Sequence, residues 1–478
     1  MKNWKKLISA GLALGLVLTS VPQSTSVVYA QENGTLQNVT FEQEQEAVQN
    51  APITVQKVNG LSKDFVNGVD VSSYLSLVES GAKYYDEKGD ETDLFDLLEN
   101  AGVNYVRLRV WNDPFPWDED GNYKYVGADG TTEYKAAAVT QAGISVNGVQ
   151  QYCLVDDPDT QVYREVYGAG VCDVATAAII GKKATDHHMK VLIDFHYSDF
   201  WADPAKQMSP KVWVTMDLTQ KCSALYAFTV DALTQIAATG VDIWMVQVGN
   251  EINGGMAGEW STNGRNQLMN AGSAAVRATL PDALVAVHFT NVSQSDAKKY
   301  IREVCEGDTP IDFDVMAYSY YSYWHGSLEN LSELMADVRE NFGKDVFIAE
   351  TAYPFTTNNL DTHPNSVPNE WCDIKQDISR DGQAADFRET VETAIQAGAL
   401  GVCYWEPAWI PVPGNSWEEQ SKLWEQFGSG WASSYAGGYD PQDAGAWFGG
   451  CAWENQALFE VDGTPAWTLS LPNLLRGE

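Results

Sequence analysis

Short β-rich apolar runs alternate with helical patterns along most of this chain. Eight strand-like runs occur, at 67–72, 103–111, 190–198, 243–251, 284–291, 313–321, 345–351 and 400–407. Helical patterns lie at 90–102, 173–188, 220–239, 264–279, 294–306, 328–342 and 380–397. Such alternation implies right-handed βαβ units and a parallel sheet. Since no GxGxxG motif follows the first strand, the pattern favours an α/β fold with one closed (β/α)8 TIM barrel over an open dinucleotide-binding sheet.

Two helix boundaries can be placed from single residues. Asp173 is a good N-cap for the helix at 173–188, because its carboxylate can accept from free backbone N–H groups. Gly102 ends the helix at 90–102 and suits the left-handed position that follows many helices.

The first 30 residues have the pattern of a signal peptide. Lys2, Lys5 and Lys6 precede an apolar run at 7–18, and small residues occupy the −3 and −1 positions of a cleavage site ending at Ala30. The alternative is a membrane anchor, for which the apolar run is short. We therefore expect a signal peptide at 1–30, a flexible leader at 31–60, a catalytic domain at 61–470, and a secreted, extracellular protein.

The formal net charge of −35 argues against nucleic acid and anionic membranes as partners, because both require basic patches. A neutral polymer is compatible with this charge, and so is a solvated acidic surface with no special partner. The 17 Trp and 22 Tyr provide flat rings that fill a core and also stack on the apolar faces of sugars. We expect the protein to act as a monomer.

Seven cysteines lie far apart and show no metal-ligand spacing. Cys153 and Cys172 flank one insertion and are candidates for a loop-closing disulfide, although sequence alone cannot show the geometry. The odd number leaves at least one thiol unpaired in a monomer.

Long loops are expected after the second, seventh and eighth strands of the barrel. The segment at 112–170 is rich in Gly, Asp, Tyr and Val, and we expect a small hairpin within it. The segment at 408–454 contains six tryptophans. Both should emerge at the C-terminal rim of the barrel, where such folds carry their active sites.

Two glutamates end strand-like runs: Glu251 in IWMVQVGNE and Glu350 in DVFIAE. A carboxylate at the end of an apolar strand needs a polar place to point, and the C-terminal rim of a barrel is such a place. Two carboxyls that meet there are the minimal equipment for hydrolysis of a glycosidic bond. One must be protonated to donate to the leaving oxygen, and the other ionised to attack the anomeric carbon. We expect a separation of about 5–5.5 Å, which gives retention of configuration.

Other polar residues also fall at strand ends. Alternate residues of a strand share a face, which pairs Arg107 with Arg109, Asp194 with His196, and Tyr318 with Tyr320. We expect an arginine of the second strand and Tyr320 to hold Glu350 charged. Asn250 is expected to bind a sugar 2-hydroxyl. For each residue taken singly, a structural role in the core or in an ion pair is the alternative.

Several longer strings extend this pattern, and together they resemble glycoside hydrolase family 53, the endo-β-1,4-galactanases of clan A. They are GVDVSSYLSLVESGAKYYDEKG (68–89), VRLRVWNDP (106–114), DFHYSDFWADPAKQ (194–207), YSYYSYWHGSL (318–328), ETAYPF (350–355), YWEPAW (404–409) and NQALFE (455–460). The resemblance covers about residues 61–465, and only the insertion at 118–167 departs from it. It implies hydrolysis of β-1,4-galactan in type I arabinogalactan and pectin side chains, with retention.

The resemblance also implies individual roles. Glu251 matches the acid/base and Glu350 the nucleophile. Positions around the −1 subsite are matched by Arg109, His196, Asn250, His288, Tyr318, Tyr320 and Trp405. No cofactor is expected for catalysis.

Bacterial members of the family bind a structural calcium through the loop after the seventh strand. Asn359, Asp361, His363 and Asn365 alternate along that loop here, and Asp440 or Asp443 could approach from the last loop. The alternative is a polar turn with no metal.

Two other functions remain open at this stage. Another clan A polysaccharidase, a mannanase or xylanase, would share both glutamates but not DFHYSDFWADP. A non-catalytic sugar-binding barrel would be expected to lack one of the two acids, and both are present.

Overall fold

The computed structural model describes residues 55–121, 165–290, 292 and 297–477, together with short strands near the N-terminus and within 123–164. The chain divides into two compact units, residues 1–50 and 51–478, each with its own internal contacts. In the first unit, β1 (Ser26–Ala30) pairs with β2 (Leu36–Thr40) in an antiparallel ladder. Most residues of the expected signal peptide at 1–30 and leader at 31–60 lie outside the described residues, so both expectations stay predictions.

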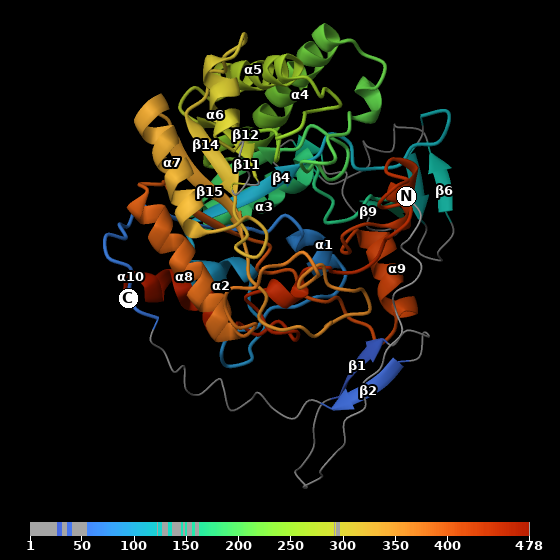
Figure 1. Ribbon diagram of the computed structural model, residues 1–478. Coiled ribbons are helices and arrows are strands. Elements are labelled where there is room, and N and C mark those ends of the chain that lie inside the picture. Colours follow the sequence, from blue (N-terminus) through green and yellow to red (C-terminus); the bar gives the residue numbers. More distant parts are fainter. Residues whose placement is uncertain are drawn as a thin grey trace. The chain divides into compact units, whose positions relative to one another are not determined.

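Eight parallel strands close into a barrel in the second unit, which confirms the predicted (β/α)8 fold (Figure 1). In chain order they are β3 (Val66–Asp70), β4 (Tyr105–Val110), β11 (Lys190–Phe195), β12 (Ile243–Val248), β13 (Leu284–Phe289), β14 (Val315–Ser319), β15 (Asp345–Thr351) and β16 (Gly401–Trp405). All eight overlap the predicted runs, but every strand except β15 ends one to three residues earlier than expected, β14 by two.

Helices surround this barrel (Figure 1). Seven coincide with the predicted helical patterns: α2 (Leu94–Asn100), α3 (Val174–Asp186), α4 (Leu218–Ala238), α5 (Thr262–Thr279), α6 (Ala297–Glu306), α7 (Leu328–Phe342) and α8 (Arg380–Gln396). The sequence patterns missed the short α1 (Tyr74–Glu79) and α10 (Leu471–Arg476), and also α9 (Trp417–Phe427). None of the helices in the described part of the chain is long and apolar enough to cross a membrane.

Both predicted helix boundaries are confirmed. The Asp173 carboxylate accepts from the backbone N–H of Thr176 at 2.7 Å and caps α3. Gly102 follows the C-cap of α2 with φ +86°, a conformation that glycine adopts without strain.

The long loops lie where they were predicted. Between β4 and α3, the described strands β5 (Tyr123–Val126), β6 (Thr132–Lys135), β9 (Val155–Asp157) and β10 (Val162–Arg164) form a small sheet, and β7 (Ser145–Val146) pairs with β8 (Val149–Gln150). Short 3-10 turns follow at Lys211–Trp213, Ser434–Gly438, Glu454–Gln456 and Trp467–Ser470. Cys153 lies outside the described residues, while Cys172 is a free, buried thiol.

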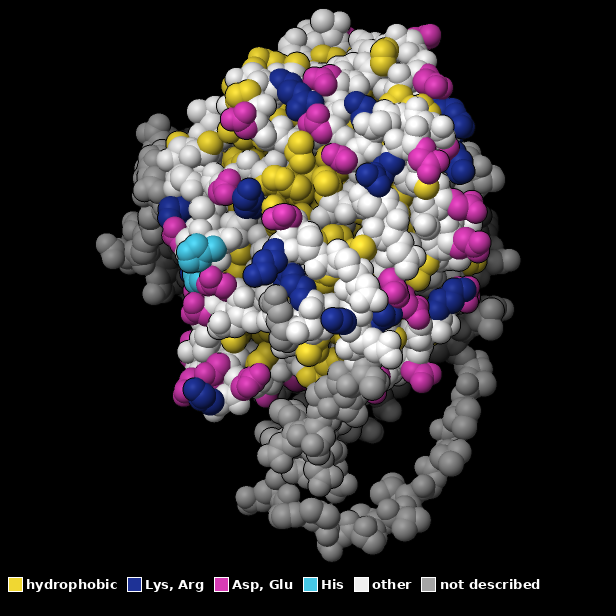
Figure 2. All heavy atoms as spheres, turned by 90° about the vertical axis from the view of Figure 1, so that its left-hand side faces the viewer, with side chains coloured by type: hydrophobic (Ala, Val, Ile, Leu, Met, Phe, Trp, Pro, Cys, Tyr) yellow, Lys and Arg dark blue, Asp and Glu magenta, His cyan; other side chains and the backbone are white. Residues whose placement is uncertain are grey.

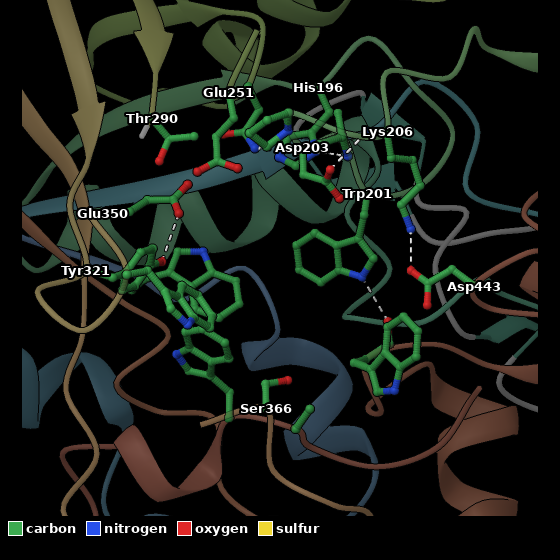
Figure 3. A pocket seen from close by; sticks show the side chains of 18 of the residues that line it. His196, Trp201, Asp203, Lys206, Glu251, Thr290, Tyr321, Glu350, Ser366 and Asp443 are labelled. Carbon is green, nitrogen blue, oxygen red and sulfur yellow. Dashed lines mark hydrogen bonds and ion pairs between the residues drawn. The ribbon is translucent and has the colours of Figure 1, made fainter. Parts of the chain in front are cut away.

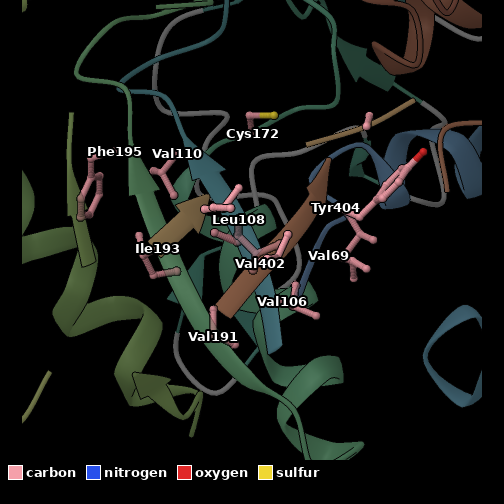
Figure 4. Close-up of a cluster of buried hydrophobic side chains, with 14 of the residues drawn as sticks. Val69, Val106, Leu108, Val110, Cys172, Val191, Ile193, Phe195, Val402 and Tyr404 are labelled. Carbon is pink, nitrogen blue, oxygen red and sulfur yellow. The ribbon is translucent and has the colours of Figure 1, made fainter. Parts of the chain in front are cut away.

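Alternation along the strands separates two cores. Val106, Leu108 and Val110 point outward from β4 into a large apolar cluster beneath the helices, with Val191, Ile193 and Phe195 of β11 beside them (Figure 4). A smaller cluster fills the barrel itself with residues of the opposite face, including Leu192, Met245, Ala286, Ala317, Phe347 and Cys403. The inward positions nearer the C-terminal ends of the strands are polar, so the functional side chains lie on a packed apolar base.

Figure 2 shows a face on which Lys and Arg are interspersed with Asp and Glu around a group of hydrophobic side chains. Among the partly exposed ion pairs of the described residues, Arg277 pairs with Asp314 at 2.8 Å.

Candidate active site

A cavity of about 510 Å³ opens at the C-terminal rim of the barrel, and both predicted glutamates line it (Figure 3). Its walls come from the loops after six barrel strands. The described residues that line it are His196, Trp201, Ala202, Asp203, Pro204, Lys206, Asn250, Glu251, Thr290, Tyr321, Trp324, His325, Glu350, Ser366, Trp405, Trp409, Trp431, Asp443, Ala452 and Trp453.

A bulge in β15 aims Glu350 into this cavity. Three steps along β15, from Ile348 to Thr351, correspond to only two steps along β16, so β15 carries one extra residue there. The same extra residue brings Glu350 opposite Ser319 of β14. Since inward and outward positions alternate along a strand, one inserted residue allows Ala349 to pack inside the barrel and Glu350 to face the site as well.

The Glu350 carboxylate is held by two groups. Its Oε1 lies 2.9 Å from Nη2 of Arg107, and its Oε2 accepts a hydrogen bond from the Tyr321 hydroxyl at 2.9 Å. A guanidinium and a phenolic donor both favour the ionised carboxylate and fix its orientation. Glu350 is therefore the group of the pair that is built to carry charge.

Glu251 is held in a different way, by its backbone. After β12 ends, Gly249 has φ +103° and Glu251 itself has φ +45°, a left-handed conformation that costs a non-glycine residue about 1 kcal/mol or more. The Glu251 N–H donates to Nδ1 of His288 at 3.3 Å, and its carbonyl accepts from the Gln207 amide at 3.3 Å. These contacts stabilise a strained turn that directs the side chain into the cavity.

The two environments separate the protonation states of the two carboxyls. Burial raises the pKa of Glu251 well above its ordinary value, and the nearby charge of Glu350 raises it further. Burial also raises the pKa of Glu350, but Arg107 and the hydroxyl of Tyr321 oppose this rise. A proton on the pair therefore belongs to Glu251, and the negative charge belongs to Glu350.

Arg107 connects the site to a buried polar layer across the barrel. Its guanidinium lies 3.0 Å from Asp70 on β3 and 2.8 Å from Asp194 on β11, and it donates to Asn250 Oδ1 at 2.9 Å. Arg107 and His196 hold the pKa of Asp194 below its usual value, although burial acts in the opposite direction. The layer thus fixes Arg107, which in turn fixes Glu350.

Asn250, His196 and His288 lie around the two glutamates, as expected. Asn250 lines the cavity and donates through Nδ2 to the carbonyl of Ala202 at 2.8 Å. His196 also lines it, with Nε2 3.1 Å from Asp194. His288 lies beneath, where its Nε2 is 2.9 Å from Ser319 Oγ, and burial lowers its pKa well below the usual range, so the ring is neutral.

Of the two arginines on the second barrel strand, Arg107 is the one that contacts Glu350. Arg109 ion-pairs with Glu406 at 2.6 Å and with Asp70 at 3.5 Å, and it does not reach Glu350. Its guanidinium lies 4.7 Å from the ring centroid of Trp201, a residue that lines the cavity. Both arginines face inward, and only their height in the barrel decides which one contacts the carboxylate.

Tyr318 and Tyr320 are also placed differently from the prediction. Tyr318 points outward from β14 into the apolar cluster beneath the helices. The Tyr320 hydroxyl donates to the carbonyl of Gly326 at 3.0 Å, so Tyr320 does not orient Glu350. Because β14 ends at Ser319, the alternation stops there, and Tyr321, the residue after Tyr320, takes the role predicted for Tyr320.

Aromatic rings form much of the cavity wall. Trp405 lines it as expected, and its ring centroid lies 6.0 Å from that of Trp201 and 4.9 Å from that of Trp453. The sequence did not single out Trp201, Trp453, Trp324 or His325 for the site. Their signals were a position in loops after barrel strands and, for all but Trp453, a place within the family strings at 194–207 and 318–328.

The predicted calcium residues do not form a set of four ligands. Asn359 Oδ1 accepts from the backbone of Asn365, and His363 Nε2 accepts from the Trp431 indole at 2.9 Å. Asp440 and Asp443 both pair with Lys206, at 2.8 and 2.6 Å. Within the described ranges, no group of three or more His, Cys, Asp or Glu residues is arranged to hold a metal.

Oxygen atoms of this loop and of Glu454, in the segment after β16, nevertheless suit a hard cation. Asn365 Oδ1 and Glu454 Oε2 are buried and have no hydrogen-bond partner in the structure. Burial raises the pKa of Asp361 to about 7, and the pKa of the nearby Glu454 is raised by burial and by Asp361. Oxygen atoms of this kind are the ligands that Ca²⁺ prefers, so Asp361, Asn365 and Glu454 fit part of a calcium site.

Known proteins resemble this chain in sequence and in fold. The profile described as "Glycosyl hydrolase family 53" matches residues 66–150 and 118–471. An endo-beta-1,4-galactanase of Bacillus subtilis (strain 168) is 44% identical over 414 residues, which cover 86% of each chain. An arabinogalactan endo-beta-1,4-galactanase of Cellvibrio japonicus (strain Ueda107) is 29% identical over 381 residues, covering 75% of this chain and 86% of that protein.

Among solved structures, the Ignisphaera aggregans GH53 catalytic domain superposes with a TM-score of 0.70 and 32% identity. The match covers 89% of this chain and 99% of that one. A fungal beta-1,4-galactanase matches with a TM-score of 0.59 and 22% identity, which supports the fold alone.

Proposed function

Because the chain belongs to glycosyl hydrolase family 53, and is therefore a glycoside hydrolase, we propose that it is an endo-β-1,4-galactanase that acts with retention of configuration. The observation that carries the proposal is the placement of Glu251 and Glu350 in one cavity with opposite electrostatic surroundings. Relatives named as galactanases supply the substrate class.

The reaction has two displacement steps. In the first, Glu350 attacks the anomeric carbon and forms a glycosyl ester while the bond to the leaving oxygen breaks, and Glu251 gives its proton to that oxygen. In the second, Glu251 accepts a proton from a water molecule, which attacks the anomeric carbon and releases Glu350 as a carboxylate. Both groups return to their starting states, so no further reactant is needed.

Two fixed partners stabilise the ionised form of Glu350. Arg107 and Tyr321 hold the carboxylate ionised before attack, and both lose part of their partner's charge when the ester forms. Asn250 stands next to Glu251 on the cavity wall, where its side chain is available to a sugar hydroxyl. The tryptophans of the wall offer flat apolar surfaces to the galactose rings.

Reducing-sugar release from debranched β-1,4-galactan tests this function, with β-mannan and xylan as parallel substrates and Glu251→Ala as the blank. We expect release from galactan alone, and none from the variant. Release from mannan or xylan alone would support another clan A polysaccharidase. If no substrate is cleaved and the chain still binds galactan, the barrel is a sugar-binding protein.

Glu350→Gln provides a second distinction between an enzyme and a binding protein. The amide removes the nucleophile but keeps the size of the side chain, so an enzyme loses turnover and retains affinity for galactan. The same affinity in a wild-type protein without turnover would refute the enzymatic function.

Secretion and a role on the galactan side chains of pectin are part of the proposal. The basic, apolar and small-residue pattern before Ala30 supports export. Mass spectrometry of the protein from culture medium should give an N-terminus at Gln31. An intact N-terminus in the cell fraction would contradict export.

Structural calcium is proposed for the loop that carries Asp361. A bound cation would hold Asp361 and Glu454 ionised and would satisfy the Asn365 side-chain oxygen. Calcium should raise the unfolding temperature of the chelator-treated wild type, and Asp361→Asn should abolish most of that rise. An equal rise in the variant, or none in the wild type, would contradict the site.

A further inference from the structure

A short turn after β11 places the carboxylate of Asp203 in the same cavity as Glu251. Asp203 lies in the loop after β11 and lines the cavity together with Glu251 (Figure 3). Its Oδ1 accepts from the backbone N–H groups of Ala205 and Lys206, at 2.8 and 2.9 Å. The carboxylate is thus fixed at one oxygen and open to the cavity at the other.

This turn is tied directly to the backbone of Glu251. One amide group, Nε2 of Gln207, donates to the carbonyls of Asp203 at 3.1 Å, Asn250 at 2.8 Å and Glu251 at 3.3 Å. Asn250 Nδ2 closes the link with the carbonyl of Ala202 at 2.8 Å. Because the connection is this tight, Asp203 cannot drift from Glu251 without breaking buried hydrogen bonds.

The charged groups around Glu251 come from several elements, and few of them are cations. On β15, Glu350 is negative, while Arg107 of β4 is already shared among Glu350, Asp70 and Asp194. His288 on β13 and His325 in the loop after β14 are neutral, because burial lowers the pKa of His288 well below the usual range and that of His325 to about 4.

Two further residues of the cavity wall, Lys206 and His196, are bound to carboxylates other than Glu251. Lys206 is occupied by Asp440 and Asp443 of the last loop, and His196 is paired with Asp194. Lys206 also acts on Asp203, but its ammonium is bound to Asp440 and Asp443, so Asp203 is the second carboxylate, after Glu350, whose charge acts on Glu251. Its charge, like that of Glu350, raises the pKa of Glu251.

We infer that Asp203 is a positioning residue of the reaction, whose negative charge holds the proton on Glu251 until the leaving oxygen takes it. The inference rests on the proposed function and deepens it. Glu350 alone cannot fill this role throughout the cycle, since it loses its charge when the glycosyl ester forms. Burial raises the pKa of Asp203, but Lys206 and the backbone N–H groups of Ala205 and Lys206 favour its charged form. Because Asp203 forms no bond to the sugar, its charge is present in both steps and preserves the basicity that Glu251 needs to take a proton from water.

The direct test is the pKa of Glu251, measured by NMR on protein labelled with [5-¹³C]glutamate. The Glu251 signal is assigned by its loss in Glu251→Gln. Asp203→Asn keeps an oxygen that can accept from Ala205 and Lys206 but removes the charge, and we expect it to lower the pKa of Glu251 by about 0.5–1 unit. The basic limb of kcat/KM on galactan should move to lower pH by the same amount.

Asp443→Asn is the matched control, because it removes another carboxylate from the same cavity wall, one that Lys206 already neutralises. It should leave the Glu251 titration unchanged. Asp203→Ser repeats the test with a different side chain that can still accept from the turn. An unmoved Glu251 signal in both Asp203 variants, or an equal shift in Asp443→Asn, would overturn the inference.

The NMR titration needs no turnover. A chain that fails to cleave galactan would refute the proposed function and leave the effect of Asp203 on Glu251 standing. Conversely, an unmoved Glu251 pKa would overturn the role of Asp203 and leave the proposed function standing.

Discussion

Replacing Tyr321 with Phe removes one hydroxyl from the site and leaves the ring in place. That hydroxyl donates to Glu350 Oε2 at 2.9 Å, and together with Arg107 it opposes the effect of burial on the Glu350 carboxyl. Loss of a donor to the charged form raises the pKa of Glu350. Since Glu350 must be ionised to attack, the acidic limb of the kcat/KM profile should move to higher pH.

The size of this shift follows from the hydrogen bond. A bond to a charged group contributes about 1.5–3 kcal/mol, and water in the cavity restores part of it. A net loss of about 1.4 kcal/mol corresponds to about one pKa unit. We therefore expect the acidic limb to rise by about one unit, with kcat at the optimum about tenfold lower.

The assay is the pH dependence of kcat/KM on β-1,4-galactan, with Tyr320→Phe as the matched control. Tyr320 is the neighbouring tyrosine, and its hydroxyl donates to the carbonyl of Gly326 at 3.0 Å, away from Glu350. Its variant should keep the wild-type acidic limb. An unmoved limb in Tyr321→Phe, or the same movement in both variants, would refute the assigned contact.

Three stability predictions concern a buried carboxyl, a helix cap and a crowded glycine. Burial raises the pKa of Asp386 to about 7, so its neutral form stabilises the fold at low pH, and this contribution is lost as the pH rises through 7. Urea unfolding should show that Asp386→Asn removes about 2 kcal/mol of the stability that the wild type loses between pH 5 and 8. An unchanged pH dependence of stability would contradict this prediction. Asp217→Ala removes the capping box of α4 and should cost about 1 kcal/mol in the same assay, and no change would argue against the cap. Gly68→Ala would place a Cβ 2.2 Å from Cys403 Sγ inside the barrel and should cost about 1–3 kcal/mol, whereas a neutral result would mean that Cys403 can move.

The barrel was predictable because its strands and helices have a strong local signal. All eight β-rich runs became barrel strands, since apolar residues at both faces of a strand suit burial between the inner cluster and the helices. The short α1 and the late α9 were missed. α9 lies in the long loop after β16, and its local signals, the Ser416 cap and the left-handed Gly428, were not used in the sequence analysis.

Within the site, sequence reasoning placed both glutamates and failed where strand alternation breaks. The prediction for Tyr320 assumed that alternation continued past Ser319, but the strand ends there and Tyr321 turns toward Glu350. The sequence predicted that an arginine of the second strand holds Glu350 but could not choose between Arg107 and Arg109, because the height of each residue in the barrel depends on pairing register rather than on sequence period. The bulge that aims Glu350 is likewise a property of three strands together.

The hydrogen bond between Gln207 and the backbone of Glu251 could not be found from sequence either. Gln207 and Glu251 lie 44 positions apart, and no local pattern links them. Contacts of this type depend on the loop after β11 folding back over the end of β12.

Proton NMR of the first products from β-1,4-galactan oligosaccharides tests the central claim most directly. A nucleophilic Glu350 with Glu251 as acid/base predicts that the β-anomer appears first and that the α-anomer forms later by mutarotation. Initial release of the α-anomer, or undiminished cleavage by Glu350→Gln, would contradict the two-glutamate mechanism.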